Sequence, residues 1–163
     1  MSKRGHLYVI AAPSGAGKTS LLQALLKRRP AVSFSVSCTT RKPRAGELDG
    51  RDYHFIDRSG FEKLIGTDEF IEHANVFGNL YGTRRSVVEA ALAEGRDLIL
   101  EIDWQGAQQV RERLPEAVQI FIRPPSRAEL EARLRRRASD SDEAIARRLQ
   151  ESDLEMSHWR DFD

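Results

Sequence analysis

A glycine-rich segment near the start of the chain carries residue types that bind phosphate. Its residues are Ala12, Pro13, Ser14, Gly15, Ala16, Gly17, Lys18 and Thr19. The glycines allow successive backbone N–H groups to curl around phosphate oxygens, an arrangement that a Cβ would obstruct. Lys18 would reach the terminal phosphates of a nucleotide, and Thr19 would offer its hydroxyl to Mg²⁺. The segment therefore predicts a binding site for a nucleoside triphosphate.

The elements on either side are of the types that position such a loop. The apolar run at residues 7–11 predicts a buried strand, and leucines at helical spacing from 21 to 26 predict a helix that stops at Pro30. The positive end of the helix dipole would face the phosphates. The usual pattern, G-x-x-x-x-G-K-[ST], begins with glycine where this chain has Ala12. Alanine is the mildest replacement there, because the tightest curvature of the loop falls later.

Length and charge narrow the class of protein. The chain has 163 residues, enough for one domain, and 26 lysines and arginines against 25 aspartates and glutamates give a net charge of +1. That balance offers no case for nonspecific binding to nucleic acid or to an anionic membrane. The single cysteine, Cys38, has no partner for an internal disulfide, and no apolar stretch resembles a membrane span or a signal peptide. We expect a soluble, cytoplasmic protein with no nucleic-acid or membrane partner.

Apolar runs alternate with helical patterns along much of the chain, which is the order typical of a parallel sheet with crossover helices. Further strands are predicted at residues 97–103 and 117–123. Further helices are predicted before Gly95, at residues 105–114 and, as two charged helices, after Pro125. The run DLILEID is apolar almost throughout, which indicates a strand buried on both faces of the sheet.

Between these parallel-sheet patterns lies a region of different character. Residues 32–38 alternate apolar and polar side chains, so we expect one strand with its apolar residues facing a core. Residues 39–53 have no apolar period and contain Arg41, Arg44 and Arg51, which indicates a structured loop. A strand at 53–56, a helix at 59–66 and a strand at 69–77 follow. Together they predict an inserted, antiparallel patch.

Five segments are specific enough to carry a family resemblance. They are APSGAGKT, FSVSCTTRKPRAGELDGRDYHF, EFIEHANVFGNLYGT, LILEIDWQG and ARLRRRASDSDEAIARRL. In this order and spacing they resemble guanylate kinase. The resemblance implies an α/β phosphate-loop nucleoside monophosphate kinase with a parallel sheet core, an inserted mixed β region that binds GMP and an arginine-rich helical lid. It implies one domain, with the core at residues 1–32 and 84–125, the GMP-binding region at 33–83 and the lid at about 126–150.

The implied reaction is ATP + GMP → ADP + GDP, with Mg²⁺ as cofactor, and the resemblance assigns residues to the GMP phosphate. They are Arg41, Arg44, Tyr53 and Tyr81. Guanidinium groups suit this task because they bind phosphate oxygens in pairs. Glu47 belongs to the same loop and would either contact the nucleotide or orient the arginines.

The resemblance also assigns residues to the guanine base. Glu72 would accept hydrogen bonds from guanine N1–H and the amino group, whereas adenine would leave this carboxylate unpaired. Taken without its flanks, Glu72 is explained equally well as the exposed face of an edge strand. Ser37 and Thr83 would complete the base pocket with hydroxyl groups. Glu101 is also assigned to the GMP site, although the family usually has aspartate at this position.

Charged residues at two further places are expected to act on the phosphates. Asp103 ends a buried strand at its carboxyl edge and, with Thr19, would hold Mg²⁺ directly or through water; the alternative is an N-cap for the next helix. The arginines that match the lid of the family are Arg133, Arg137 and Arg148. Their charges would neutralise the transferring phosphoryl group. With Lys18 and Arg41 they form the predicted catalytic set.

Two other functions remain open at this point. One is a non-catalytic guanylate-kinase-like binding module, and the other is a phosphate-loop kinase for another nucleoside monophosphate. Lys18 and Thr19 argue against the first, because such modules typically lack a working phosphate loop. The chain stops at SHWRDFD, where the family continues into one more strand and a closing helix. We therefore expect a C-terminally truncated protein with an exposed sheet edge.

Overall fold

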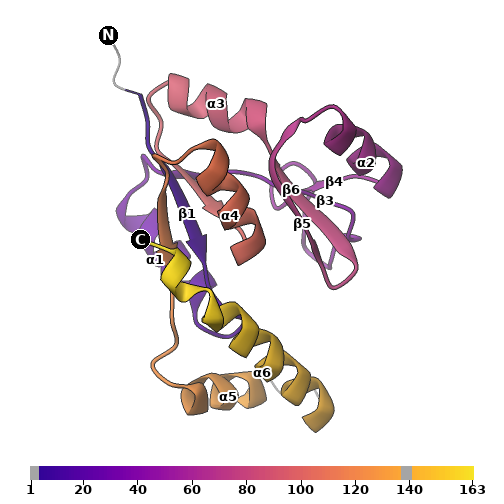
Figure 1. Ribbon diagram of the computed structural model, residues 1–163, viewed down its shortest axis with the longest axis vertical. Helices are drawn as coiled ribbons and strands as arrows, with labels where there is room; N and C mark the ends of the chain where they lie inside the picture. Colours follow the sequence, from indigo (N-terminus) through magenta and orange to yellow (C-terminus); the bar gives the residue numbers. More distant parts are fainter. Residues whose placement is uncertain (1–3, 137–140) are drawn as a thin grey trace.

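The computed structural model describes residues 4–136 and 141–163. Within these residues, one sheet has four parallel strands in the order β2-β7-β1-β8 (Figure 1). Their bounds are Ser33–Phe34 (β2), Leu98–Glu101 (β7), Leu7–Ala11 (β1) and Val118–Phe121 (β8). Strand β1 lies inside the sheet, with Val9 opposite Leu100 on one side and Gln119 on the other. The loop that follows β1 therefore leaves the carboxyl edge of the sheet, where ligands bind in α/β folds.

A second, mixed sheet, also of four strands, belongs to the inserted region and lies to one side of the parallel sheet (Figure 1). Its order is β4-β3-β6-β5, with bounds His54–Phe55 (β4), Cys38–Thr39 (β3), Asn79–Arg84 (β6) and Phe70–Val76 (β5). Strand β6 is antiparallel to both β3 and β5, but β4 pairs parallel with β3. The expectation of a wholly antiparallel patch is wrong, because the long loop after β3 returns the chain in the same direction. The mixed region implied by the family resemblance is confirmed.

The prediction of a single strand at residues 32–38 is also wrong. Ser33 and Phe34 pair with β7 in the parallel sheet, and the chain then crosses to the mixed sheet at Cys38. Phe34 packs against the core and, like Val36, lines a cavity, whereas Cys38 packs in the apolar cluster of the inserted region. The alternation of apolar and polar residues is real, but the segment changes sheets and so presents its apolar side chains to different surroundings.

Strand β6 is absent from the sequence predictions, and its position is set by a tight turn. Phe77 and Gly78 connect it to β5 with φ angles of 53° and 81°. Two positive φ angles are the mark of a type I′ hairpin turn, which usually carries asparagine or aspartate before glycine. Because this chain has phenylalanine at the first position, the sequence does not predict the turn.

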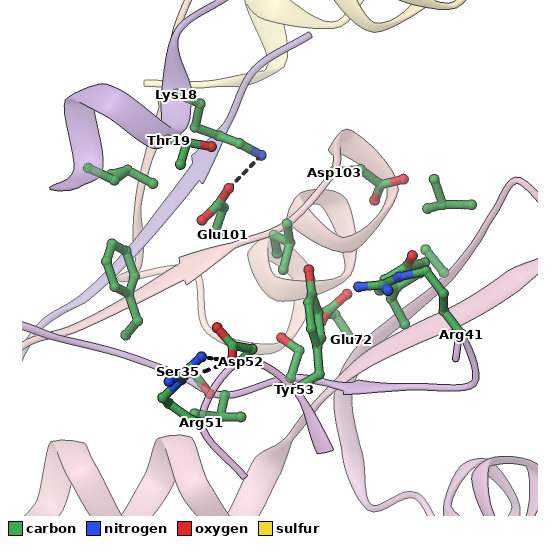
Figure 2. A pocket seen from close by; sticks show the side chains of 18 of the residues that line it. Lys18, Thr19, Ser35, Arg41, Arg51, Asp52, Tyr53, Glu72, Glu101 and Asp103 are labelled. Carbon is green, nitrogen blue, oxygen red and sulfur yellow. Dashed lines mark hydrogen bonds and ion pairs between the residues drawn. The ribbon is translucent and has the colours of Figure 1, made fainter. Parts of the chain in front are cut away.

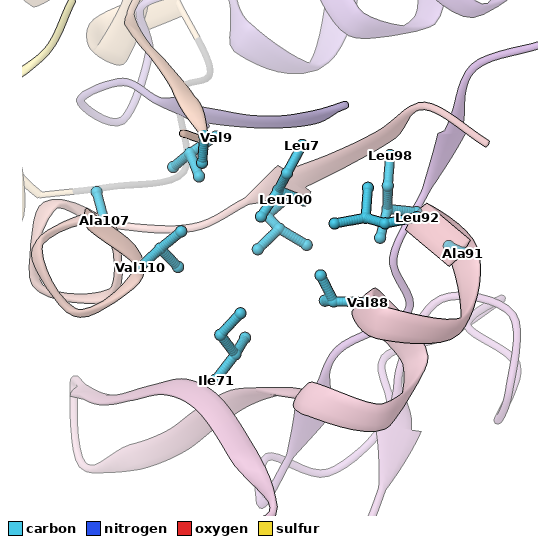
Figure 3. Packing of buried hydrophobic residues seen from close by; sticks show 11 residues of the cluster. Leu7, Val9, Ile71, Val88, Ala91, Leu92, Leu98, Leu100, Ala107 and Val110 are labelled. Carbon is cyan, nitrogen blue, oxygen red and sulfur yellow. The ribbon is translucent and has the colours of Figure 1, made fainter. Parts of the chain in front are cut away.

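The helices follow the predicted segments closely. They are α1 (Lys18–Arg28), α2 (Arg58–Gly66), α3 (Arg85–Ala93), α4 (Trp104–Arg113), α5 (Arg127–Arg136) and α6 (Asp142–Ser157), followed by the 3₁₀ helix η1 (Trp159–Asp161). Figure 3 shows the main core, in which Leu100 of β7 packs with Val88 of α3 and Val110 of α4. Ile99 packs on the opposite face of the sheet with Leu22 of α1. Strand β7 is therefore buried on both faces, as predicted.

Residues 70–72 connect the apolar cores of the two sheets, and the last of them lines a cavity. A β-bulge between Phe70 and Glu72 buries three consecutive side chains: Phe70 in the inserted region, Ile71 in the main core and Glu72 at 3% exposure. Helix α4 covers the outer edge of β5, where the Gln109 amide accepts a hydrogen bond from His73 N at 3.0 Å and donates one to His73 O at 2.7 Å. The open edge of the mixed sheet is thus paired with a side chain, and Glu72 is enclosed.

Helices α5 and α6 lie at the other end of the molecule and share a small apolar cluster (Figure 1). Its residues are Leu130, Leu134, Ile145 and Leu149. Helix α6 continues to Ser157, beyond the predicted lid, and carries the chain back toward the parallel sheet. In the part of the chain that the structure describes, no helix is both long and apolar enough to cross a membrane.

Candidate active site

The phosphate loop joins β1 to α1 in one tight turn. Gly15 and Gly17 have φ angles of 85° and 92°, in the left-handed region that favours glycine. Gly17 is the N-cap of α1, so the first N–H groups of the helix face the loop. A cavity of about 310 Å³ lies here, and its lining includes Ala12, Pro13, Ser14, Gly15, Gly17, Lys18 and Thr19. We call it the loop cavity.

Helix α5 packs directly on this loop. A Cβ at Gly15 would lie 3.1 Å from Leu130 Cδ1 and 3.2 Å from Leu134 Cδ2. Arg133 donates from Nη1 to the carbonyl oxygen of Ala16 at 3.2 Å, and from Nε to Glu129 Oε1 at 2.8 Å. The structure therefore places the Arg133 guanidinium against the phosphate loop.

Lys18 is paired across the cleft with the end of β7. Its Nζ lies 3.3 Å from Glu101 Oε1 (Figure 2). Lys18, Thr19 and Glu101 line the loop cavity and also a larger cavity of about 610 Å³, which we call the acceptor cavity. The sequence assigns Glu101 to GMP alone, whereas the structure places it between the two cavities.

The acceptor cavity collects most of the residues predicted to bind GMP. Those in its lining are Ser37, Arg41, Arg44, Tyr53, Glu72, Tyr81 and Glu101. Tyr53, Glu72 and Arg41 lie on the side opposite Lys18 (Figure 2). Glu47 and Thr83 lie outside the lining, and each contacts a residue within it.

Glu47 holds Arg41 in a two-point contact. Arg41 donates from Nη1 to Oε2 and from Nη2 to Oε1, both at 2.9 Å, and the Arg44 backbone N–H donates to Oε2 at 2.8 Å. The hydrogen bonds from Arg41, followed by that from Arg44, lower the pKa of Glu47 to about 2. Of the two roles left open for Glu47, these contacts support the orientation of arginines.

Glu72 is a buried carboxylate with one close partner. The residue is only 3% exposed to solvent, and Thr83 Oγ1 donates a hydrogen bond to Glu72 Oε1 at 2.5 Å. Ser37 Oγ lies 3.4 Å from the same threonine hydroxyl. Burial raises the pKa of Glu72 to about 7, with a smaller contribution from the charge of Asp103 and against the effect of the Thr83 hydrogen bond. The alternative reading of Glu72 as an exposed strand face is wrong, because α4 covers the edge of β5.

Aromatic rings complete the wall beside Arg41. Tyr53 and Tyr81 meet edge to face with ring centroids 6.0 Å apart, and Arg41 Cζ lies 5.3 Å from the Tyr53 centroid. Burial raises the pKa of the Tyr53 phenol, so it remains a hydrogen-bond donor at neutral pH. Two phenols and a guanidinium thus converge on one part of the cavity, and all three groups can donate hydrogen bonds to an anion.

Thr19 and Asp103 both line the acceptor cavity. Asp103 caps α4: its Oδ1 accepts from Gly106 N and its Oδ2 from Gln105 Nε2, both at 2.9 Å. Each carboxylate oxygen keeps a further lone pair, and hydroxyl and carboxylate oxygens are donors that suit Mg²⁺. The two residues therefore fit a magnesium ion. Among residues 4–136 and 141–163, no group of three or more histidine, cysteine, aspartate or glutamate side chains is arranged to hold a metal.

A second lid arginine, Arg148, lines neither of these cavities. Arg148 lines a separate hollow between α6 and the hairpin turn, together with Arg147, Glu151 and Phe77. Arg137 lies outside the described residues. Of the lid arginines that the structure describes, Arg133 donates to the phosphate loop and Arg148 lines the hollow beside the hairpin turn.

Sequence reasoning missed three charged residues of the cavities. Arg51 and Asp52 line the acceptor cavity as an ion pair of 2.7 Å (Figure 2), and the Leu48 backbone N–H donates to Asp52 at 2.8 Å. Glu155 of α6 lines the loop cavity. Arg51 stood out in the loop without a role, whereas nothing distinguished Glu155 from the solvated charges of a surface helix.

Comparison with known proteins identifies the family. The family model of guanylate kinase matches residues 4–163. The chain belongs to the guanylate kinase family. It is 58% identical over 159 residues to the guanylate kinase of Alkalilimnicola ehrlichii and 53% identical over 162 residues to that of Escherichia coli K12, covering 98% of this chain and 78% of each relative. The crystal structure of guanylate kinase from Anaplasma phagocytophilum matches with a TM-score of 0.76 at 39% identity, over 99% of this chain and 75% of that one.

Membership of the guanylate kinase family confirms the resemblance, the α/β phosphate-loop fold and the class of enzyme, a nucleoside monophosphate kinase. The alternative of a kinase from another nucleotide family gains no support from these relatives. The roles of individual guanylate kinase residues in this chain remain predictions, which the geometry above now makes specific.

Proposed function

We propose that this chain transfers the γ-phosphoryl group of ATP to GMP at the wall shared by its two cavities. The observation that carries this proposal is that Lys18 and Thr19 line both cavities. Donor phosphates in the loop cavity and an acceptor phosphate in the acceptor cavity would therefore meet at one lysine. The acceptor is already a phosphate oxyanion, so the reaction needs positioning and charge neutralisation rather than a nucleophilic side chain.

On the donor side, residues 12–19 bind the ATP phosphates through backbone N–H groups and the N-terminus of α1. Lys18 exchanges its ion pair with Glu101 for the phosphates, and Arg133 stabilises the charge of the transferring group from above the loop. Thr19 and Asp103 would hold Mg²⁺, which when bound neutralises negative charge on the phosphates. Contacts of α5 with the loop exclude water that would otherwise hydrolyse ATP.

On the acceptor side, Arg41, Arg44, Tyr53 and Tyr81 hold the GMP phosphate, and Glu47 fixes the direction of the Arg41 fork. Glu72 accepts hydrogen bonds from the guanine edge while Thr83 fixes its carboxylate, and Ser37 contacts the Thr83 hydroxyl. Adenine offers an acceptor where guanine offers N1–H, so AMP would leave the buried carboxylate without a partner.

The acceptor preference tests this function directly. ADP formation is measured with ATP, Mg²⁺ and each of GMP, AMP, CMP and UMP. We expect GMP to exceed the other three in kcat/KM by roughly 100-fold or more. A second acceptor used as well as GMP would refute the assignment of the base site, and GMP binding without ADP formation would indicate a binding module.

A further inference from the structure

Helix α6 directs one carboxylate into the loop cavity. Glu155 lines this cavity with Ser14, Gly15 and Lys18, although it comes from the far end of the chain. Burial raises its pKa to about 7, while Lys18 and the backbone N–H of Ser14 act in the opposite direction. The carboxylate is therefore held among the groups that attract phosphate.

The loop cavity thus contains negative charge of its own. Glu101 pairs with Lys18 at 3.3 Å, and Glu155 lies near the same ammonium group and the Ser14 amide. A bound triphosphate would add several negative charges to a space of about 310 Å³. Like charges at such separations repel strongly in a partly buried site. Phosphate and the Glu155 carboxylate are therefore competitors for one set of donors.

Because Glu155 lies on α6, this competition for donors affects the helix that also carries Arg148. Glu155 and Arg148 belong to the same continuous helix, Asp142–Ser157. They are seven residues apart, about two turns, and so share one face of the helix. Glu151 lies between them on that face and lines the hollow beside Phe77 with Arg148. Displacement of the Glu155 side chain therefore acts on helix α6, which also carries Arg148.

We propose that Glu155 is a positioning residue through which an occupied phosphate loop moves α6. Without ATP its carboxylate occupies part of the phosphate site; when ATP binds, the phosphates displace it, and α6 shifts with Arg148. The proposal rests on the proposed function, because it requires ATP in the loop cavity.

Two native tryptophans report on this end of α6. The Trp104 ring stacks on His158, the residue that follows the helix, with centroids 3.8 Å apart and planes at 5°. Trp159 lies under Arg123, whose Cζ is 4.6 Å from the ring centroid. A shift of α6 disturbs both contacts, so tryptophan fluorescence detects the movement without an added label.

The test is ATP binding to the whole chain with Mg²⁺ and without GMP, measured by titration calorimetry and by tryptophan fluorescence. Glu155→Gln keeps the shape of the side chain and removes its charge. We expect it to bind ATP at least fivefold more tightly than the unchanged chain, and to show less than half of the fluorescence change. Glu155→Asp keeps the charge but shortens the side chain, and should give intermediate values for both.

Glu151→Gln is the matched control, since it removes the same charge from the same helix face outside the loop cavity. Its ATP affinity should stay within twofold. Equal or weaker ATP binding by Glu155→Gln, or an undiminished fluorescence change, would overturn the proposal while leaving the proposed function intact. Failure of the unchanged chain to bind ATP would overturn both, and the first titration reveals it.

Discussion

Gly106 of helix α4 lies against the carboxylate of Glu72, so closely that a Cβ at position 106 would overlap Glu72 Oε2. The other carboxylate oxygen accepts the hydrogen bond from Thr83. The helix that covers the edge of β5 therefore also fixes the group proposed to recognise guanine. Only a residue without a side chain permits this approach.

Gly106→Ala is expected to displace the Glu72 carboxylate. Overpacking of this kind costs about 1–3 kcal/mol, offset in part by the better helix propensity of alanine, about 1 kcal/mol. We expect KM for GMP to rise at least tenfold, with little change in KM for ATP. Gly66→Ala is the control, because a Cβ at this helical glycine meets nothing within 4 Å. An unchanged KM for GMP in Gly106→Ala would argue against a role of this contact in base binding.

Glu72→Gln should remove guanine preference while leaving ATP binding intact. The amide keeps the shape of the side chain but presents N–H groups toward guanine N1–H and its amino group. We expect kcat/KM for GMP to fall by roughly 100-fold or more, and the ratio between GMP and AMP to fall with it. Glu69→Gln changes an exposed carboxylate just before β5 and should leave both values unaltered. If the GMP to AMP ratio survives in Glu72→Gln, another group reads the base.

The raised pKa of Glu72 predicts a pH dependence of stability in the absence of nucleotide. The folded pKa is about 7 against an ordinary value of 4.5, so the folded state retains a proton that the unfolded state releases between these values. The free energy of unfolding should therefore decrease as pH rises from about 4.5 to 7, by up to roughly 3 kcal/mol from this group.

Urea denaturation of the unchanged chain and of Glu72→Gln between pH 5 and 8 measures that dependence. The glutamine cannot titrate, so the variant should be the more stable protein at pH 8 and should show a shallower decrease. Glu155 has a pKa raised in the same direction, and Glu72→Gln combined with Glu155→Gln should be shallower still. Parallel curves for the unchanged chain and Glu72→Gln would show that Glu72 is ionised throughout.

Glu47→Gln should impair GMP binding through Arg41. The low pKa of Glu47 keeps its carboxylate charged at neutral pH. The glutamine amide has only one oxygen, so it can accept only one of the two hydrogen bonds from Arg41. We expect KM for GMP to rise about tenfold and KM for ATP to stay the same, because Arg41 lines only the acceptor cavity. Glu62→Gln is the control, since its partner Arg58 is exposed on α2 at 3.7 Å. Equal GMP kinetics in the two variants would contradict an orienting role.

The parts of the site that depend on local sequence were predictable. Gly15, Gly17 and Lys18 form a loop whose geometry follows from residue type, and the flanking strand and helix form where hydrophobic periodicity indicates. Most of the residues that the resemblance assigns to GMP also gather around one cavity, although they come from β5, β6, β7 and the segments on either side of β3.

The parts that depend on contacts between distant segments were not predictable. Residues 32–38 have a strand pattern, but which sheet each half joins is decided by β7 and β6. Glu72 is buried because α4 covers an edge strand, and the strand pattern alone does not predict that a helix packs there. Glu155 reaches the phosphate loop only through the path of α6, while its sequence neighbours read as an ordinary charged helix.

Phosphoryl transfer from ATP to GMP is measured most directly by following the γ-phosphate of labelled ATP in the presence of GMP and Mg²⁺. We expect the label to appear in GDP only when GMP is present. Lys18→Ala should remain folded and should reduce the rate by roughly 100-fold or more. Label released as inorganic phosphate instead of GDP, or an undiminished rate in Lys18→Ala, would contradict phosphoryl transfer at the wall shared by the two cavities.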